Sequence, residues 1–245
     1  MEKRVVISQS MYFPWVGLFE QIRLADVFVH YDDVQFTRGS FSNRVQVKTS
    51  QGLKWATVPL QDHQFGQNIN EVLISDRNDW RSQHRELLRQ AYFKAPFRDD
   101  MLALLDRVFA QPATTLADIS RASIIELANY FNLVDGKAFI DSTELKIGGS
   151  GSQRVHDIVL ALDGNVYVTG HGGRNYLEHH LFEQSSIAVK YMQYRCIPYT
   201  QLHGEFTPYV TGLDLIANCG VEGAYVIQSE AKYWQDFTDT NNQPS

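Results

Sequence analysis

The stretch Gln9-Ser10-Met11-Tyr12-Phe13-Pro14-Trp15-Val16-Gly17 joins an apolar strand pattern at residues 4–7 to a helix pattern. The helix pattern places apolar residues at i, i+3, i+4 and i+7, namely Trp15, Leu18, Phe19 and Ile22. A second apolar run at residues 27–31 then ends in the carboxylates of Asp32 and Asp33. Strand, loop, helix and strand in this order indicate a βαβ unit, and open α/β sheets bind ligands beyond the carboxyl ends of such strands. We therefore expect a binding site at this point of the chain.

The alternation of strand and helix patterns returns near the middle of the chain. Apolar strand patterns at residues 138–141, 166–169 and 188–192 are separated by helix patterns. Between the two α/β portions, residues 41–60 alternate around Ser50-Gln51-Gly52. This alternation predicts an antiparallel hairpin.

A helical insertion is predicted after the hairpin. Residues 69–74 form a short strand pattern, and residues 78–133 then carry three amphipathic helix patterns. We predict an α/β fold, in which a mainly parallel sheet is flanked by helices and carries a β-hairpin and a helical insertion. Residues 1–237 would form a single domain with a helical subdomain at about 78–133, and the polar residues 238–245 would form a flexible tail.

Composition and charge exclude several classes of protein. The chain has 245 residues, a hydrophobic fraction of 44% and a net charge of −6, which is typical of a globular protein and argues against a nucleic-acid binder. The first apolar run stops at Ser8, too early for a signal peptide, and no apolar stretch approaches the ~20 residues of a membrane span. Cys196 and Cys219 lack metal-ligand spacing, so we expect free thiols and no metal site. These features predict a cytoplasmic protein without membrane insertion.

The polar residues after the second strand are the first candidates for a site. Asp32, Asp33 and Gln35 follow a run that otherwise reads as buried. Adjacent strand residues point to opposite faces, so one of the two carboxylates is expected to face the site, and the pattern does not say which. That carboxylate could bind a ligand hydroxyl or amine, hold Mg²⁺, or act as a general base. Before this strand, Gln9, Tyr12 and Trp15 are candidates for substrate binding, although the aromatic residues could equally cap the core and fix a turn.

A second candidate group lies on the predicted hairpin. It consists of Asn43, Arg44 and Lys48. Arg44 and Lys48 are four residues apart, so both side chains point to one side of a strand. Two cations on one face suit a phosphate or a carboxylate, and a solvated strand face is the alternative.

Two glycine loops form the third candidate group. The first spans residues 147–151, and the second is Gly170-His171-Gly172-Gly173-Arg174-Asn175-Tyr176. Each lies between a strand pattern and a helix pattern, where free backbone N–H groups attract anions. Gly170, His171, Arg174 and Tyr176 are therefore binding candidates, although neither loop matches a Walker or G-x-G-x-x-G motif. His203, in the loop Leu202-His203-Gly204-Glu205-Phe206, is a candidate for catalysis, whereas His84 lies on an apolar stripe and is expected in the core.

The chain resembles the WbqC-like family of bacterial surface-polysaccharide (O-antigen) gene clusters. The residues that carry the resemblance are Gln9 to Gly17, Ala25 to Val29, Asp32 to Phe36, Asn43-Arg44, Trp55 to Pro59, Gly170 to Leu177 and His203 to Pro208. Ser10 departs from the pattern, because the family usually has proline there. The resemblance implies an enzyme of lipopolysaccharide biosynthesis that modifies a nucleotide-linked sugar. Ala25 to Phe36 and Gly173 to Leu177 also look like segments of pantothenate synthetase, an adenylate-forming ligase, but the paired histidines of that family are missing.

Three functions are compatible with these patterns. In the leading hypothesis, a transferase attaches an acyl or aminoacyl group to a nucleotide-linked amino sugar. Arg44, Lys48, Arg174 and the glycine loop would hold phosphates, and Asp32 or Asp33, together with His203, would take the proton from the sugar amine. The second hypothesis is an ATP-dependent carboxylate–amine ligase with ATP and Mg²⁺ as cofactors. The third is a sugar- or nucleotide-binding accessory protein without turnover. We expect Tyr194, Tyr199 and Tyr209 to be exposed, and such aromatic residues would suit the interface of a homo-oligomer.

Overall fold

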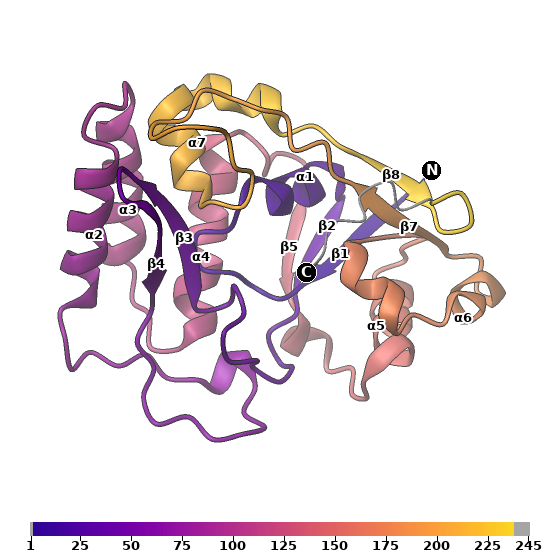
Figure 1. Ribbon diagram of the computed structural model, residues 1–245. Coiled ribbons are helices and arrows are strands. Elements are labelled where there is room, and N and C mark those ends of the chain that lie inside the picture. The colour runs from indigo at the N-terminus through magenta and orange to yellow at the C-terminus, as the bar shows by residue number, and fades with distance from the viewer. Residues whose placement is uncertain (1, 238–245) are drawn as a thin grey trace.

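A six-stranded sheet forms the centre of the protein in the computed structural model, which describes residues 2–237 (Figure 1). The strand order is β5-β2-β1-β6-β7-β8. The strands are β1 (Arg4–Ser8), β2 (Val27–His30), β5 (Ala138–Asp141), β6 (Val166–Thr169), β7 (Ala188–Gln193) and β8 (Glu230–Tyr233). Neighbouring strands are parallel, except that β8 runs antiparallel to β7. The predicted α/β fold with a mainly parallel sheet is therefore confirmed.

The central strands are apolar along their whole length because helices cover both faces of the sheet. Val5 pairs with Val27 and Val6 pairs with Phe28, and each of these four side chains is buried. Val6 and Phe28 belong to one core cluster, whereas Val5 and Val27 belong to a second cluster on the opposite face. An uninterrupted apolar run is typical of a strand that is buried on both faces.

Within residues 2–237, three helices flank the sheet, three form the insertion, and one packs against the insertion. The flanking helices are α1 (Val16–Leu24), α5 (Gly151–Ala161) and α6 (His179–Gln184), the inserted helices are α2 (Trp80–Ala91), α3 (Arg98–Ala110) and α4 (Leu116–Tyr130), and α7 (Gly212–Cys219) contacts α3. Short 3-10 helices are η1 (Ile69–Glu71), η2 (Ser142–Leu145), η3 (His171–Asn175) and η4 (Gly220–Val226). Among the described residues, no helix combines the length and the apolar character needed to cross a membrane.

The insertion lies to one side of the sheet and contains the predicted hairpin (Figure 1). Strands β3 (Arg44–Thr49) and β4 (Gly52–Thr57) pair in antiparallel register from Arg44 with Thr57 to Thr49 with Gly52. Gly52 has a φ of +98°, a conformation that favours glycine at the end of this turn. The hairpin prediction is thus confirmed. One cluster of buried side chains includes residues of the hairpin, of α2–α4 and of the sheet, so the insertion shares its core with the sheet.

The strand predicted at residues 69–74 is wrong. Residues 69–71 form η1, because Asn68 and Glu71 form a capping box at its start. Only isolated bridges follow, in which Leu73 pairs with Thr115 and Ile74 pairs with Leu60. The single domain at residues 1–237 stays a prediction, and the tail predicted at 238–245 lies outside the described residues.

The chain order creates one topological switch point. From β1 the chain proceeds to β2 and later to β5 on one side, and then to β6 on the other side of β1. The carboxyl ends of β1 and β6 therefore lie side by side, while the segments that follow them turn in opposite directions. Open α/β sheets bind their ligands at such a point.

Candidate functional site

A cavity of about 820 Å³ lies at the switch point. Its wall includes Ser8 and Gln9 after β1, Tyr31 and Asp33 after β2, and the residues from Thr169 to Gly173 after β6. The lining also includes the first residues of α5 and the side chains of Trp15, Gln21, Gln35, Tyr176 and Tyr194. Its volume falls in the range of ~300–1,000 Å³ that is usual for small-molecule sites. We refer to it as the switch-point cavity.

Asp32 is fully buried and holds the first loop in place. Its carboxylate accepts hydrogen bonds from the N–H of Ser10 at 2.8 Å, from the Ser10 hydroxyl at 2.8 Å and from Nε of Arg121 at 2.6 Å. Burial raises the pKa of the Asp32 carboxyl, and the bonds from Ser10 and the charge of Arg121 oppose that shift. A proline at position 10 has neither a backbone N–H nor a hydroxyl and could donate neither bond, so the link from this loop to Asp32 depends on Ser10.

Asp33 faces the switch-point cavity and is paired with a residue of α5. Arg154 forms an ion pair with its carboxylate, and Arg154 Nη1 also donates to the Asp33 carbonyl at 3.3 Å. The Ser142 hydroxyl donates to Asp33 Oδ1 at 2.5 Å. Arg154 Nε donates to the Ile147 carbonyl at 3.0 Å, and its guanidinium lies 4.9 Å above the Tyr31 ring. Arg154 therefore ties the loop before α5 to the end of β2.

The N-terminus of α5 opens onto the switch-point cavity through the first glycine loop. Gly149 and Gly151 have φ values of +89° and +61°, which favour glycine over residues with a side chain. Within the described structure, the N-cap residue Ser150 makes no side-chain capping bond, and the first turn carries no acidic residue. The first N–H groups of a helix have no partner inside the helix, and together with the helix dipole they attract anions.

The second glycine loop, which forms η3, brings His171 to the same cavity. His171 Nε2 lies 2.8 Å from the carbonyl oxygen of Met192. A carbonyl can only accept a hydrogen bond, so Nε2 is the donor and Nδ1 is the ring nitrogen that is left to exchange a proton. A Cβ at Gly172 would meet no atom within 4 Å, whereas one at Gly173 would lie 2.9 Å from Leu177.

Aromatic rings form a further part of the wall. Trp15 lies 5.1 Å from the Tyr194 ring and 5.4 Å from the Tyr209 ring, measured between ring centres. A Cβ at Gly17 would lie 2.1 Å from the Trp15 ring, so glycine at this position lets the indole fold back over α1. Gln21 donates a hydrogen bond to the Tyr194 hydroxyl.

Half of the residues that were candidates from the sequence meet in this cavity. Those lining it are Gln9, Trp15, Asp33, Gln35, Gly170, His171 and Tyr176. Asp32 and Tyr12 are not among the described residues that line it, since Asp32 holds Ser10 and the Tyr12 hydroxyl is hydrogen bonded to Nδ1 of buried His84 at 2.9 Å. Tyr12 thus fills the core, and the prediction of a core histidine at His84 is confirmed.

The other candidates lie elsewhere. Asn43 and Arg44 border a separate cavity of about 470 Å³ beside the hairpin. Lys48 is buried, and its Nζ donates to Gln201 Oε1 at 3.1 Å and to the Gly204 carbonyl at 3.2 Å. His203 Nε2 donates to the carbonyl of Ala91 at 2.6 Å. The guanidinium of the exposed Arg174 lies 5.4 Å from the Phe237 ring centre. The structure therefore does not bring Arg44, Lys48 and Arg174 together.

Sequence patterns did not identify several residues of this site, among them Gln21, Tyr31, Arg154 and Tyr194. Tyr31 and Tyr194 each follow a strand by one residue, so the rule that ligands bind at strand ends could have found them. Arg154 lies in the first turns of α5, and nothing in the sequence relates it to Asp33. Across residues 2–237, no three His, Cys, Asp or Glu side chains are grouped so that they could share a metal ion.

Comparison with known proteins identifies the family. Residues 9–225 match the WbqC-like protein family. The chain is 34% identical over 223 residues to the uncharacterized protein Rv1507c of Mycobacterium tuberculosis (strain ATCC 25618 / H37Rv), and the match covers 90% of this chain and 95% of that protein. No solved structure shows a significant match to the chain. By these two matches, the chain belongs to the WbqC-like protein family.

Proposed function

We propose that the protein is a transferase that attaches an acyl or aminoacyl group to an amino sugar carried on a nucleotide, and that the reaction takes place in the switch-point cavity. The observation that carries this proposal is that one cavity contains both an anion-attracting helix N-terminus and a histidine, His171, whose Nε2 is bonded to a backbone carbonyl. The first feature suits the diphosphate of a nucleotide-linked sugar, and the second suits removal of a proton from its amine. The resemblance to proteins of O-antigen gene clusters favours a role in making surface-polysaccharide precursors.

Each part of the cavity has a role in this proposal. The N–H groups after Ser150 bind the diphosphate, and Trp15 and Tyr176 offer flat apolar surfaces to the base or to the sugar ring. Arg154 neutralises Asp33 and positions the loop, so the carboxylate does not repel the phosphates. Asp33 is engaged by Arg154 and Ser142, which makes His171 the better candidate for the base.

The proposed chemistry begins with proton transfer. His171 Nδ1 takes a proton from the sugar ammonium, which leaves the nitrogen with a lone pair. The nitrogen then attacks the carbonyl carbon of the acyl donor, a C–N bond forms, and the nitrogen releases its second proton to bulk water. The bond from the carbonyl carbon to the leaving group breaks, and the leaving group departs with the electron pair. The imidazolium returns its proton to the leaving group, so the enzyme ends in its initial state.

Adenylation of the donor is less well supported by this geometry. That route requires cations at the α-phosphate of ATP, and Lys48 and Arg174 were the candidates for this role. Lys48 instead binds the loop that contains Gly204, and Arg174 lies over Phe237. Direct transfer to the sugar needs only the groups that line the switch-point cavity.

A pair of variants at Gly172 tests the location of the site. Gly172 lines the cavity, and a side chain there meets open space, so both Gly172→Glu and Gly172→Gln are expected to fold. Their side chains are nearly isosteric, but only Glu would repel phosphates. We expect Gly172→Gln to bind nucleotide-linked amino sugars more than tenfold more tightly than Gly172→Glu does, as measured by isothermal titration calorimetry. Equal affinities would place the ligand elsewhere.

A variant at His171 tests the reaction. Turnover is followed by mass spectrometry with panels of acyl donors and nucleotide-linked amino sugars. We expect His171→Gln to keep substrate affinity and to lower kcat by about 10²–10⁴-fold, the usual contribution of a general base. Release of AMP in the presence of ATP and Mg²⁺ would favour the ligase instead. Failure of every nucleotide-linked sugar to bind would refute the proposal.

A further inference from the structure

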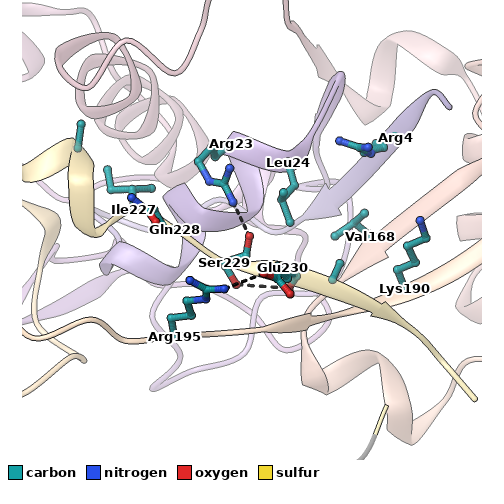
Figure 2. A pocket seen from close by; sticks show the side chains of 12 residues that line it. Arg4, Arg23, Leu24, Val168, Lys190, Arg195, Ile227, Gln228, Ser229 and Glu230 are labelled. Atoms are coloured by element: carbon teal, nitrogen blue, oxygen red, sulfur yellow. Dashed lines mark hydrogen bonds and ion pairs between the residues drawn. The ribbon is translucent and has the colours of Figure 1, made fainter. Parts of the chain in front are cut away.

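A second cavity, of about 660 Å³, lies beside the C-terminal end of α1 (Figure 2). Arg23 and Leu24 of α1, Val168 of β6, Lys190 of β7 and the segment that leads into β8 line it, together with Arg4 and Arg195. We call it the basic groove. Of the described residues, none lines both the basic groove and the switch-point cavity. The function proposed above assigns no role to it.

Four cations from separate segments meet in the basic groove, although the chain as a whole has a net charge of −6. They are Arg4, Arg23, Lys190 and Arg195. Two carboxylates partly balance them. Glu230 pairs with Arg195 at 2.7 Å, and Glu2 pairs with Arg4 at 3.0 Å and with Lys190 at 3.2 Å. The Glu230 and Glu2 side chains are 64% and 49% exposed, so these ion pairs are weak and can yield to a ligand.

Arg23 adds positive charge that its neighbours do not neutralise. One of its Nη atoms donates to the carbonyl of Ser229, as Figure 2 shows, while its Nε is buried without a hydrogen-bond partner among the described residues. Glu20, one turn earlier on α1, is fully buried, and burial raises the pKa of its carboxyl to about 7. Near neutral pH this carboxyl is therefore only partly ionised, so it balances only part of the charge of Arg23.

From these features we infer that the basic groove is a second ligand site, which binds a polyphosphate. Figure 2 shows Arg23 and Arg195 on one side and Arg4 and Lys190 on the other, so several phosphate groups can be bound at once. Guanidinium groups bind phosphate oxygens in pairs, which favours phosphate over a single carboxylate. The described lining residues include no aromatic ring, so a nucleobase would find no ring to stack on. The polyphosphate itself is thus the part of the ligand that is recognised.

Calorimetric titration of the full chain with inorganic triphosphate at low ionic strength tests this inference. We expect Lys190→Ala and Arg195→Ala each to weaken binding about tenfold or more, and the double variant to show no detectable binding. Lys232→Ala is the matched control. Lys232 is an exposed cation on β8 whose register partner on β7 is Tyr191, and Tyr191 packs on the face of the sheet that is opposite to the basic groove. This variant removes the same charge and should leave the affinity unchanged. ATP should bind no more tightly than triphosphate.

The outcomes separate this site from the switch-point cavity. Lys190 and Arg195 have side chains that are 26% and 49% exposed, so their truncation is expected to leave the fold intact, which the melting temperature checks. Equal loss of affinity in Lys232→Ala would reveal a general charge effect and overturn the inference. Loss in Gly172→Glu, with Lys190→Ala unaffected, would place the phosphates in the switch-point cavity and also overturn it. Absence of binding to the wild-type protein would do the same.

Discussion

Replacing the buried carboxyl of Glu20 by an amide should make the protein more stable above neutral pH. Glu20 lies in the middle of α1, and neither of its carboxylate oxygens has a hydrogen-bond partner within residues 2–237. Burial raises the pKa of this group from its ordinary 4.5 to about 7, and the polar groups of Ser229 and of the Arg195 backbone, followed by the charges of Arg23 and Arg195, offset the shift only in part. Glu20→Gln retains the shape of the side chain and removes the titration.

The size and sign of the effect follow from the two pKa values. Below about pH 4.5 the carboxyl is protonated in the folded and the unfolded chain, so its ionisation does not lower the free energy of unfolding. Between pH 4.5 and 7 the unfolded chain loses the proton first, so stability falls as the pH rises, and the full loss is reached above pH 7. A shift of about 2.5 units at about 1.4 kcal/mol per unit corresponds to about 3 kcal/mol.

Urea unfolding of wild type and Glu20→Gln between pH 4.5 and 8 measures this effect. The two proteins share every other titrating group, so the difference between their free energies of unfolding isolates Glu20. A buried amide can add a constant offset, but it cannot add a slope with pH. We expect the difference to grow by about 3 kcal/mol in favour of the variant from pH 4.5 to pH 8. A difference that stays constant over this range would show that Glu20 ionises normally in the folded protein.

Two further predictions concern stability and are checked by urea unfolding. Asp32→Asn should destabilise the protein by about 1–3 kcal/mol, because it removes the charge that accepts the bonds from Ser10 and Arg121 while Arg121 keeps its ion pair with Asp141, and an unchanged midpoint would refute this. Gly164→Ala should cost about 1–3 kcal/mol because its Cβ would lie 2.6 Å from a methyl group of Val5. Gly148→Ala, whose Cβ meets no atom within 4 Å, is the control and should change stability by less than about 0.5 kcal/mol.

The sheet could be predicted from the sequence because its central strands are apolar on both faces. Residues 5–7 and 27–29 form uninterrupted apolar runs, and the structure buries them between helices. The hairpin was predictable as well, because alternation and Gly52 both mark it. The strand predicted at residues 69–74 was wrong because Ile69 is buried in η1 and Ile74 in an isolated bridge, rather than in a ladder. The capping box formed by Asn68 and Glu71 favours a 3-10 helix at residues 69–71 over the strand that the apolar pattern predicts.

The candidate site was only partly predictable, because its contacts join distant parts of the chain. Alternation indicated that one of Asp32 and Asp33 would face the site, but only the position of Arg121, 89 residues from Asp32, shows which one is buried. Arg154 lies 121 residues from Asp33, and no spacing rule connects them. Lys48 has the pattern of an exposed cation, yet the loop that contains Gln201 covers it.

Helix α1 is a common wall of the two cavities. Gln21 lines the switch-point cavity, and Arg23, two residues later, lines the basic groove. The segment after β7 is divided in the same way, because Tyr194 lines the first cavity and Arg195 lines the second. The bond between Gln21 and the Tyr194 hydroxyl joins the two segments, so we expect a ligand that displaces Arg23 or Arg195 to shift the wall of the switch-point cavity as well. Coupling between two sites is reciprocal, so a polyphosphate in the groove would change the affinity for a nucleotide-linked sugar by the same factor as the sugar changes that for the polyphosphate.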